Sequence, residues 1–366
     1  MITSRFLRNV LIKGLLLFAA INLVWAALDP SLGKLSSYNI LFKGRERLPF
    51  GEDSARSYNL SLYDLDAMFA SLRLDGSHKS PNEFRVFVIG DSSTWGTLLK
   101  PEETLAGMLD TANLKTASGK EVHVYNLGYP TLSLTKDLMI LDYALQYQPD
   151  LILWPVTLES FPCERQLLSP IVANNTQRVA KLINQYKLDL TPQVKKTTFW
   201  DKTLIGQRRA LADLLRLQFY GVMWSATGVD QTYPTDYERA ARDLEADETF
   251  HDWTPPSIPA DGLAFDVIQA GIKAAGNVPV VLINEPMLIS TGENSDIRYN
   301  FYYPRWVYDQ YRQAFSSQCE TNAWTCLDLW DAVPEEQFTN SAIHLDPQGE
   351  GMLVEMIIAA GIINLK

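Results

Sequence analysis

The sequence predicts an α/β domain in which helices cover both faces of a central parallel sheet. Five short apolar runs alternate with helical patterns, as expected when each strand is followed by a helix that crosses back over the sheet. The runs are nearly continuous in apolar residues, which a strand buried on both faces requires. The predicted strands are 84–89, 122–127, 151–157, 278–284 and 326–330. The predicted helices are 104–114, 134–147, 263–275, 306–316 and 347–362.

One long interval, residues 161–259, interrupts this alternation. The chain has 366 residues, and an α/β domain with a long insertion can hold that length around a single core. We therefore expect one domain over residues 81–366, with an inserted helical cap at 161–259. Within the cap, residues 204–224 are apolar on more than one face. This stretch is expected either to pack over the domain core or to touch a bilayer or an acyl chain.

The N-terminus has the pattern of a membrane segment. Arg5, Arg8 and Lys13 precede an apolar run that only Asn22 interrupts before Leu28. The stretch is about long enough to span a hydrocarbon core, and its positive flank is expected to stay cytoplasmic. The sequence therefore predicts a single-pass membrane protein with an extracytoplasmic domain.

The expected order is a cytoplasmic N-terminus at 1–9, a transmembrane signal anchor at 10–28 and a stalk at 29–80 that docks onto the domain. The alternative is a cleaved signal peptide, because Val-Trp-Ala at 24–26 loosely fits a small-residue cleavage site. Both interpretations place the domain outside the cytoplasm, either at the cell surface or in the periplasm.

Composition and charge exclude several function classes. Hydrophobic residues make up 46% and charged residues 20% of the chain, which allows a sizeable core. The net charge of −11 disfavours nucleic acid as a partner, since phosphates would be repelled. The four histidines are scattered and no nucleotide-binding fingerprint is present, so neither a metal site nor a cofactor is expected.

Three cysteines give a weaker signal. Cys319 and Cys326 lie close together between a predicted helix and a predicted strand, and a disulfide there would suit an oxidising compartment. Two independent buried thiols are the open alternative. Cys163 has no obvious partner in the sequence.

A serine follows the first predicted strand in Gly90-Asp91-Ser92, with Gly96 a few residues later. Because active sites of such sheets lie beyond the carboxyl ends of the strands, the Ser92 hydroxyl is placed where a nucleophile is needed. The glycines permit a tight turn whose amides can face a developing oxyanion. The alternative is a polar turn in which the serines only cap the next segment.

Two further motifs point to the same sheet edge. Asn126-Leu127-Gly128 ends the second predicted strand, so the Gly128 amide is expected to face the same site. His344 lies just before the last predicted helix, and histidine is a base suited to activating a serine near neutral pH. We therefore expect Ser92 and His344 to meet as nucleophile and general base.

The end of the fourth predicted strand adds polar candidates. Asn284 and Glu285 occupy a strand end and are expected to line the cleft. Arg298 and the tyrosines that follow it are placed to contact a sugar or an acyl group. A packed aromatic loop is the alternative for these residues.

Together, these motifs resemble the SGNH/GDSL hydrolase superfamily over residues 83–362. Gly90-Asp91-Ser92 matches the first block, Asn126-Leu127-Gly128 the second and His344 the last. The run 149–154 matches the strand that leads into the third block. The resemblance implies a flavodoxin-like three-layer sandwich. It also implies a Ser92 nucleophile, a His344 base and an oxyanion hole that includes the Ser92 and Gly128 amides.

Two positions depart from the family pattern. The asparagine of the third block is replaced by Glu159, whose carboxylate would repel an oxyanion, and Ser160 is the neighbouring alternative donor. The aspartate that usually lies three residues before the histidine is replaced by Ser341, preceded by Asn340. A backbone carbonyl, Asn340 or Ser341 is therefore expected to orient the histidine.

Three other polar residues are candidates for orienting groups or for the cleft: Asp91, Asn126 and Asp346. Asp346 is followed by proline and an apolar helical run, which is also the pattern of a helix N-cap.

From these features we expect a membrane-anchored, extracytoplasmic serine esterase or O-acyltransferase. The anchor makes acyl esters of cell-envelope glycans or lipids, acetyl esters first, the expected substrates. The rival hypothesis is a non-catalytic protein of the same fold that holds a glycan or lipid or acts in assembly. A third is a lipase-like or lysophospholipase-like esterase whose apolar cap admits acyl chains.

Overall fold

The computed structural model describes residues 3–35, 44–50, 64–190, 198–227 and 236–363. Its sheet has five parallel strands in the order β2-β1-β3-β4-β5. This is the flavodoxin-like order, so the expected architecture and all five predicted strands are confirmed. The strands are β1 Glu83–Val88, β2 Glu121–Asn126, β3 Leu151–Val156, β4 Val280–Asn284 and β5 Thr325–Asp328.

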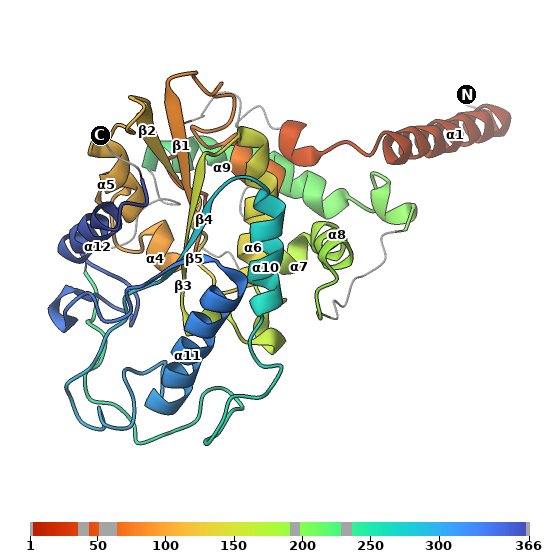
Figure 1. Ribbon diagram of the computed structural model, residues 1–366. Coiled ribbons are helices and arrows are strands. Elements are labelled where there is room, and N and C mark those ends of the chain that lie inside the picture. Colours follow the sequence, from red (N-terminus) through yellow and green to blue (C-terminus); the bar gives the residue numbers. More distant parts are fainter. Residues whose placement is uncertain (1–2, 36–43, 51–63, 191–197, 228–235, 364–366) are drawn as a thin grey trace.

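Helices form a layer on each face of the sheet (Figure 1). The layer on one face comprises α5 Leu105–Thr111 and α12 Pro347–Ala359. The opposite layer comprises α3 Leu65–Ala70, α6 Leu134–Ala144, α10 Phe265–Ala275 and α11 Arg305–Asn322. Strand β3 is buried along its whole length, as predicted, whereas β5 is partly exposed because it forms the edge of the sheet.

The remaining described helices are short or lie outside these layers. The α-helices are α1 Ser4–Leu28, α4 Ser92–Trp95, α7 Pro170–Asn174, α8 Thr176–Tyr186 and α9 Arg208–Thr227. The first 3-10 helices are η1 Leu32–Leu35, η3 Pro101–Glu103, η4 Leu145–Tyr147 and η5 Leu158–Ser160. The others are η6 Cys163–Arg165, η7 Trp200–Lys202 and η8 Glu335–Gln337.

The region predicted as a stalk contributes to the core of the domain. Leu65, Met68 and Phe69 of α3 are buried in the main apolar cluster, which also contains residues of β1 and α6. Arg47 is fully buried and reaches the loop after α4. The parts of the predicted stalk at 36–43 and 51–63 lie outside the described residues.

The cap region contains η6, α7, α8, η7 and α9, followed by a largely irregular stretch. Helix α9 packs on the domain through η1 and α3, outside the main apolar cluster, which leaves both interpretations of this apolar stretch as predictions. Its Leu217 packs with Leu32 and Ala67 in a separate cluster that Trp25 of α1 also joins. Exposed apolar side chains, among them Phe219, lie elsewhere on the same helix.

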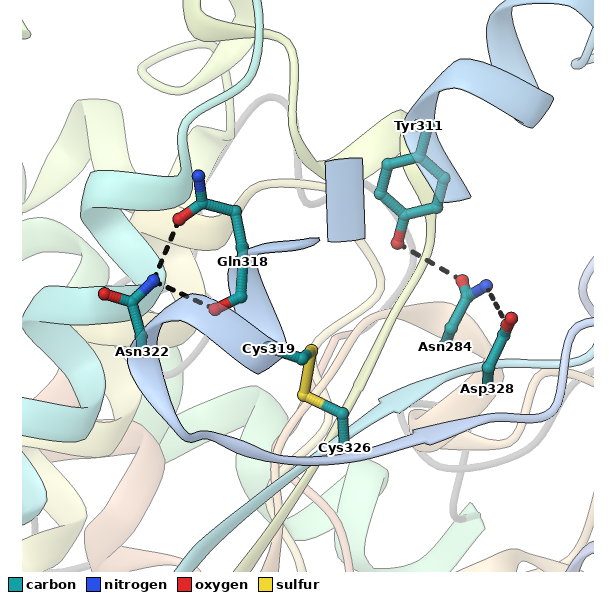
Figure 2. The surroundings of a disulfide bond; sticks show 7 residues. All are labelled: Asn284, Tyr311, Gln318, Cys319, Asn322, Cys326 and Asp328. Carbon is teal, nitrogen blue, oxygen red and sulfur yellow. Dashed lines mark hydrogen bonds between the residues drawn. A yellow bond between two sulfur atoms is a disulfide. The ribbon is translucent and has the colours of Figure 1, made fainter. Parts of the chain in front are cut away.

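A disulfide joins Cys319, in the last turn of α11, to Cys326 in β5 (Figure 2). The disulfide interpretation of the two cysteines is therefore confirmed. Cys163 is a free, half-buried thiol.

Helix α1 projects away from the rest of the molecule (Figure 1). It is long and apolar enough to cross a membrane, and within the described residues it is the one helix that meets these criteria. Its C-terminal end is anchored by side chains, because Trp25 Nε1 donates to Gln207 Oε1 at 2.8 Å and Ala26 is buried.

Candidate active site

Two distant stretches of chain bring a hydroxyl and an imidazole together at the carboxyl edge of the sheet. Ser92 begins α4 directly beyond β1, and His344 lies in the loop before α12. Ser92 Oγ and His344 Nε2 are 2.7 Å apart. The predicted meeting of these side chains is therefore present in the structure, in hydrogen-bonding geometry.

Asn340 orients the imidazole. Its Oδ1 lies 2.8 Å from His344 Nδ1. An amide oxygen can only accept, so Nδ1 of a neutral imidazole must donate and Nε2 is left as the acceptor for the serine proton. Asn340 thus favours the His344 tautomer in which Nε2 can accept a proton, but it places no negative charge beside the ring.

Burial governs the basicity of His344, lowering its pKa to about 4. Because Asn340 is neutral, its contact adds no carboxylate charge to offset this effect. The imidazole is therefore uncharged at neutral pH and able to take a proton, but its conjugate acid is poorly stabilised.

The Ser92 turn is held by side chains on both sides. Asp91 is the N-cap of α4 and accepts from the Ser93 amide at 2.8 Å. Asn126 Nδ2 donates to the Thr94 carbonyl at 2.7 Å. A Cβ at Gly128 would lie 2.5 Å from the Trp95 nitrogen, so only glycine allows this close approach. Asp91 and Asn126 therefore position the turn.

The Gly128 amide has a partner of its own, contrary to the expectation that it faces the oxyanion. It donates to Asn126 Oδ1 at 2.9 Å, because the asparagine side chain folds back over the strand end. The Ser160 amide is likewise engaged, donating to the Thr157 carbonyl at 2.9 Å. The Ser92 amide, by contrast, is the first of α4, a position for which the helix itself provides no acceptor.

Glu159 is buried and has basic partners from the cap. Its Oε2 lies 2.9 Å from His251 Nε2, and its Oε1 lies 3.5 Å from Arg165 Nε. These polar contacts hold the buried carboxylate in place. Glu159 therefore links the end of β3 to the cap, a role that its sequence position did not indicate.

Several other predicted site residues have structural partners instead. Asn284 was expected in the cleft but is fully buried, where it donates to Asp328 and accepts from Tyr311 (Figure 2). Arg298 is also buried, and its guanidinium donates to backbone carbonyls, including that of Phe301. Asp346 caps α12 through the Gly349 amide, at 2.9 Å.

Ser341 does not orient the histidine. It is buried, and its side chain is hydrogen-bonded to the phenol of Tyr302. The Tyr302 hydroxyl is also close enough to Glu159 and Asp91 for their charges to act on it, and burial, the largest effect, raises its pKa. Tyr302 thus lies near the site, as the tyrosine-rich sequence after β4 allowed.

Two buried cations that brace the Ser92 turn were missed. Lys136 Nζ donates to the Gly90 carbonyl at 2.6 Å and pairs with Asp137 at 2.5 Å. Arg47 donates to the carbonyls of Trp95 and Gly96 at 2.9 and 2.8 Å. For Lys136 the available signal in the sequence was the adjacent Lys136-Asp137 pair at the start of a predicted helix that is otherwise largely apolar.

A carboxyl group also contacts the turn that carries Ser92. Glu285 accepts a short hydrogen bond from Ser93 Oγ. Burial, followed by the charge of Asp91, raises the pKa of Glu285 well above its usual range. Through this contact Glu285 supports the residue next to Ser92. Within the described ranges, no cluster of His, Cys, Asp and Glu side chains could hold a metal ion.

The domain has the flavodoxin-like three-layer architecture that the resemblance to SGNH/GDSL hydrolases implied. Its paired serine and histidine lie at the carboxyl edge of the sheet. No family model and no curated protein matches the chain.

Several solved structures are similar to the chain. One is a lipase/acylhydrolase from Enterococcus faecalis, with a TM-score of 0.40 and 14% identity, covering 77% of this chain and 97% of that one. Another is a carbohydrate acetylesterase family member from Sinorhizobium meliloti, with a TM-score of 0.33 and 12% identity, covering 76% and 98%. A third is a member of the lipolytic G-D-S-L family from Veillonella parvula, with a TM-score of 0.34 and 10% identity, covering 75% and 96%.

Proposed function

We propose that this protein is a divergent SGNH-type serine esterase or O-acyltransferase, anchored in the membrane with its domain outside the cytoplasm. The observation that carries the proposal is the Ser92–His344–Asn340 chain of contacts, with distances of 2.7 and 2.8 Å. It joins a nucleophile, a base in the required tautomer and an orienting group.

The proposed chemistry proceeds through an acyl-serine. Ser92 Oγ attacks the acyl carbonyl carbon while His344 Nε2 takes the hydroxyl proton. The tetrahedral oxyanion is held by the Ser92 amide, and its collapse expels the alcohol, which receives the proton from His344. Water or an acceptor hydroxyl then attacks the acyl-serine while His344 takes its proton; collapse breaks the bond to Ser92 Oγ, which regains that proton from His344. The first case is hydrolysis and the second is acyl transfer.

Two features support an extracytoplasmic, anchored location. The Cys319–Cys326 disulfide suits an oxidising compartment. Cleavage near residues 24–26 would cut a continuous helix next to Trp25, whose indole is hydrogen-bonded to the cap. The anchor interpretation therefore agrees better with these contacts than a cleaved signal peptide does. Acyl esters of cell-envelope glycans or lipids, acetyl esters first, are the substrates that such a location favours.

A second candidate is a non-catalytic protein that uses the same fold to hold a glycan or lipid. It is favoured by the engaged Gly128 amide, which donates to Asn126, and by the absence of a charged group on His344 Nδ1. Both features reduce the stabilisation available to charges that develop in the transition state.

A fluorophosphonate probe separates the two candidates. We expect the full-length protein to be labelled at neutral pH, where the imidazole is uncharged, and Ser92→Ala to lose the label. Ser93→Ala is the matched control, because this neighbouring hydroxyl contacts Glu285 rather than the imidazole, and it should retain labelling. Wild-type protein that stays unlabelled from acid to alkaline pH would favour the binding protein.

A further inference from the structure

A hollow of about 460 Å³ separates the C-terminal half of α1 from a segment of the cap. On the cap side, the lining belongs to the 198–207 segment, which contains η7 and leads into α9. On the α1 side it includes Phe18 and Leu23. The exposed surface of the hollow is almost entirely apolar, an unusual property for a site meant to face water.

The large side chains of the 198–207 segment point away from the protein. Trp200 is 73% exposed, Ile205 52% and Phe199 47%. Phe18 and Leu23 of α1 are exposed beside them. The exposed apolar surface of α1 thus continues onto the cap.

The length of α1 sets how deep this segment lies. From Val10 to Leu28 the helix rises about 28 Å, close to the roughly 30 Å of a hydrocarbon core. The helix can therefore span the core only if its last turns lie inside it. The 198–207 segment contacts α1 at Asn22, about 9 Å before Leu28 at 1.5 Å per residue. A spanning α1 consequently carries this segment into the outer half of the bilayer.

Several polar groups of the segment have partners within it, which lowers the cost of placing them in lipid. Thr198 donates through its amide and its hydroxyl to Asp201, both at 2.8 Å. The Thr203 hydroxyl donates to the Trp200 carbonyl at 2.7 Å and accepts from the Gly206 amide at 3.1 Å.

The polar contacts with α1 follow the same rule. Asn22, the residue that interrupts the apolar run, accepts from the Ile205 amide at 3.3 Å and donates to the Phe18 carbonyl. Lys202 pairs with Asp29 at 2.5 Å, just beyond the end of α1. Asn22 thus provides a partner for a backbone amide of the cap segment.

We infer that the 198–207 segment is a second membrane contact, embedded in the outer leaflet with lipid acyl chains filling the hollow beside α1. This inference rests on the proposed membrane anchor and extends it from one helix to a two-part attachment. Lipid is favoured over a protein partner because the surface is continuous with α1 and exposes a tryptophan, a residue that concentrates at membrane interfaces. The attachment would hold the cap, and with it the domain, in a set orientation to the bilayer.

The test measures the lipid contact of single labelled positions in the full-length protein, reconstituted in phosphatidylcholine–phosphatidylglycerol vesicles. A cysteine-reactive NBD fluorophore is attached to Trp200→Cys, Leu16→Cys or Leu168→Cys in a Cys163→Ser background. Leu16 lies on the exposed surface of α1, and Leu168 is an exposed leucine elsewhere in the cap. Quenchers are nitroxide-labelled phosphatidylcholine in the bilayer and iodide in the water.

We expect lipid nitroxide to quench positions 200 and 16 several-fold more than position 168, and iodide to give the reverse order. If position 200 behaves like 168 while 16 is quenched by lipid, the inference is overturned and the anchor stands. If position 16 is also reached only by iodide, the anchor itself fails. Protection of position 200 from both quenchers would mean that protein, such as a second copy, covers the hollow, and would also overturn the inference.

A second label guards against a local effect of replacing the tryptophan. Ile205→Cys changes a different exposed side chain of the same segment and should reproduce the lipid quenching. Each labelled protein is compared with the wild type by thermal unfolding, so that a misfolded variant is recognised. Iodide quenching at position 205 in a correctly folded variant would count against the inference.

Discussion

The replacement Asn340→Asp tests the assignment of the orienting group most directly. It places a carboxylate where an amide oxygen now lies 2.8 Å from His344 Nδ1. A neutral hydrogen bond contributes about 1 kcal/mol and a charge-assisted one about 1.5–3 kcal/mol, so the imidazolium gains roughly 1 kcal/mol. Residue 340 is exposed, so solvent screens part of the interaction and the charge-assisted hydrogen bond is expected at the lower end of its energy range.

The sign of the effect follows from the charge. A carboxylate stabilises the protonated imidazole, so the replacement raises the pKa of His344 from about 4 by roughly one unit. The base works in its uncharged form, and the acid limb of the rate profile should therefore move to higher pH by the same amount. Above that limb, the imidazolium that forms in the transition state is better stabilised, and kcat should rise by up to about fivefold.

The assay is the hydrolysis of p-nitrophenyl acetate, together with the rate of fluorophosphonate labelling, from acid to neutral pH. Gln348→Glu is the matched control, because it adds a negative charge at an exposed position of α12. It should leave the acid limb in place. Ser341→Asp restores the aspartate at the family position, but it should not reproduce the gain, since that side chain contacts Tyr302.

An unchanged acid limb in Asn340→Asp, or a slower reaction, would refute the assignment of Asn340 as the orienting group. An equal shift in Gln348→Glu would show that the effect comes from net charge rather than from contact with the imidazole.

Three further predictions concern stability. Burial raises the pKa of Glu350 to about 8, so its ionisation costs folding energy as pH rises from the unfolded value towards 8. Glu350→Gln should therefore increase the free energy of unfolding in urea by on the order of 3 kcal/mol near pH 8 and by little near pH 4. Glu355→Gln, at an exposed position of the same helix, should change it at neither pH. Glu159→Gln should lower the free energy of unfolding by about 1–3 kcal/mol, because it weakens the contacts of the buried carboxylate with His251 and Arg165, and should leave kcat nearly unchanged. Glu164→Gln, at an exposed position nearby, is its control. Cys319→Ser should cost about 2 kcal/mol, and reduction of the wild-type disulfide should cost the same; unequal losses would argue against the bond.

The sequence determined the architecture and the pair of residues at its centre. Apolar runs located all five strands; the runs of β1, β3 and β4 follow from burial on both faces, whereas the edge strands β2 and β5 are partly exposed. The position of Ser92 at a strand end and of His344 before the last helix then placed both at one edge of the sheet, since parallel strands end on the same side. Asp346 as an N-cap was also visible locally, in the proline that follows it.

Only the tertiary structure decided which partners these side chains have. Asn340, rather than Ser341, contacts the imidazole because the path of the loop, and not its composition, sets the direction of each side chain. In the same way, Asn284 turned out to be buried beside Asp328, and the Gly128 amide is already engaged.

The cations beneath the nucleophile turn depend on contacts that are still more distant in sequence. Arg47 lies in the region predicted to be a stalk and donates to the Gly96 carbonyl after α4. Lys136 lies in helix α6 and donates to the Gly90 carbonyl. Apolar periodicity reports which side of an element is buried. It does not report which polar group lies opposite, because that depends on how separate elements pack, and this is why the supporting residues emerged only from the folded chain.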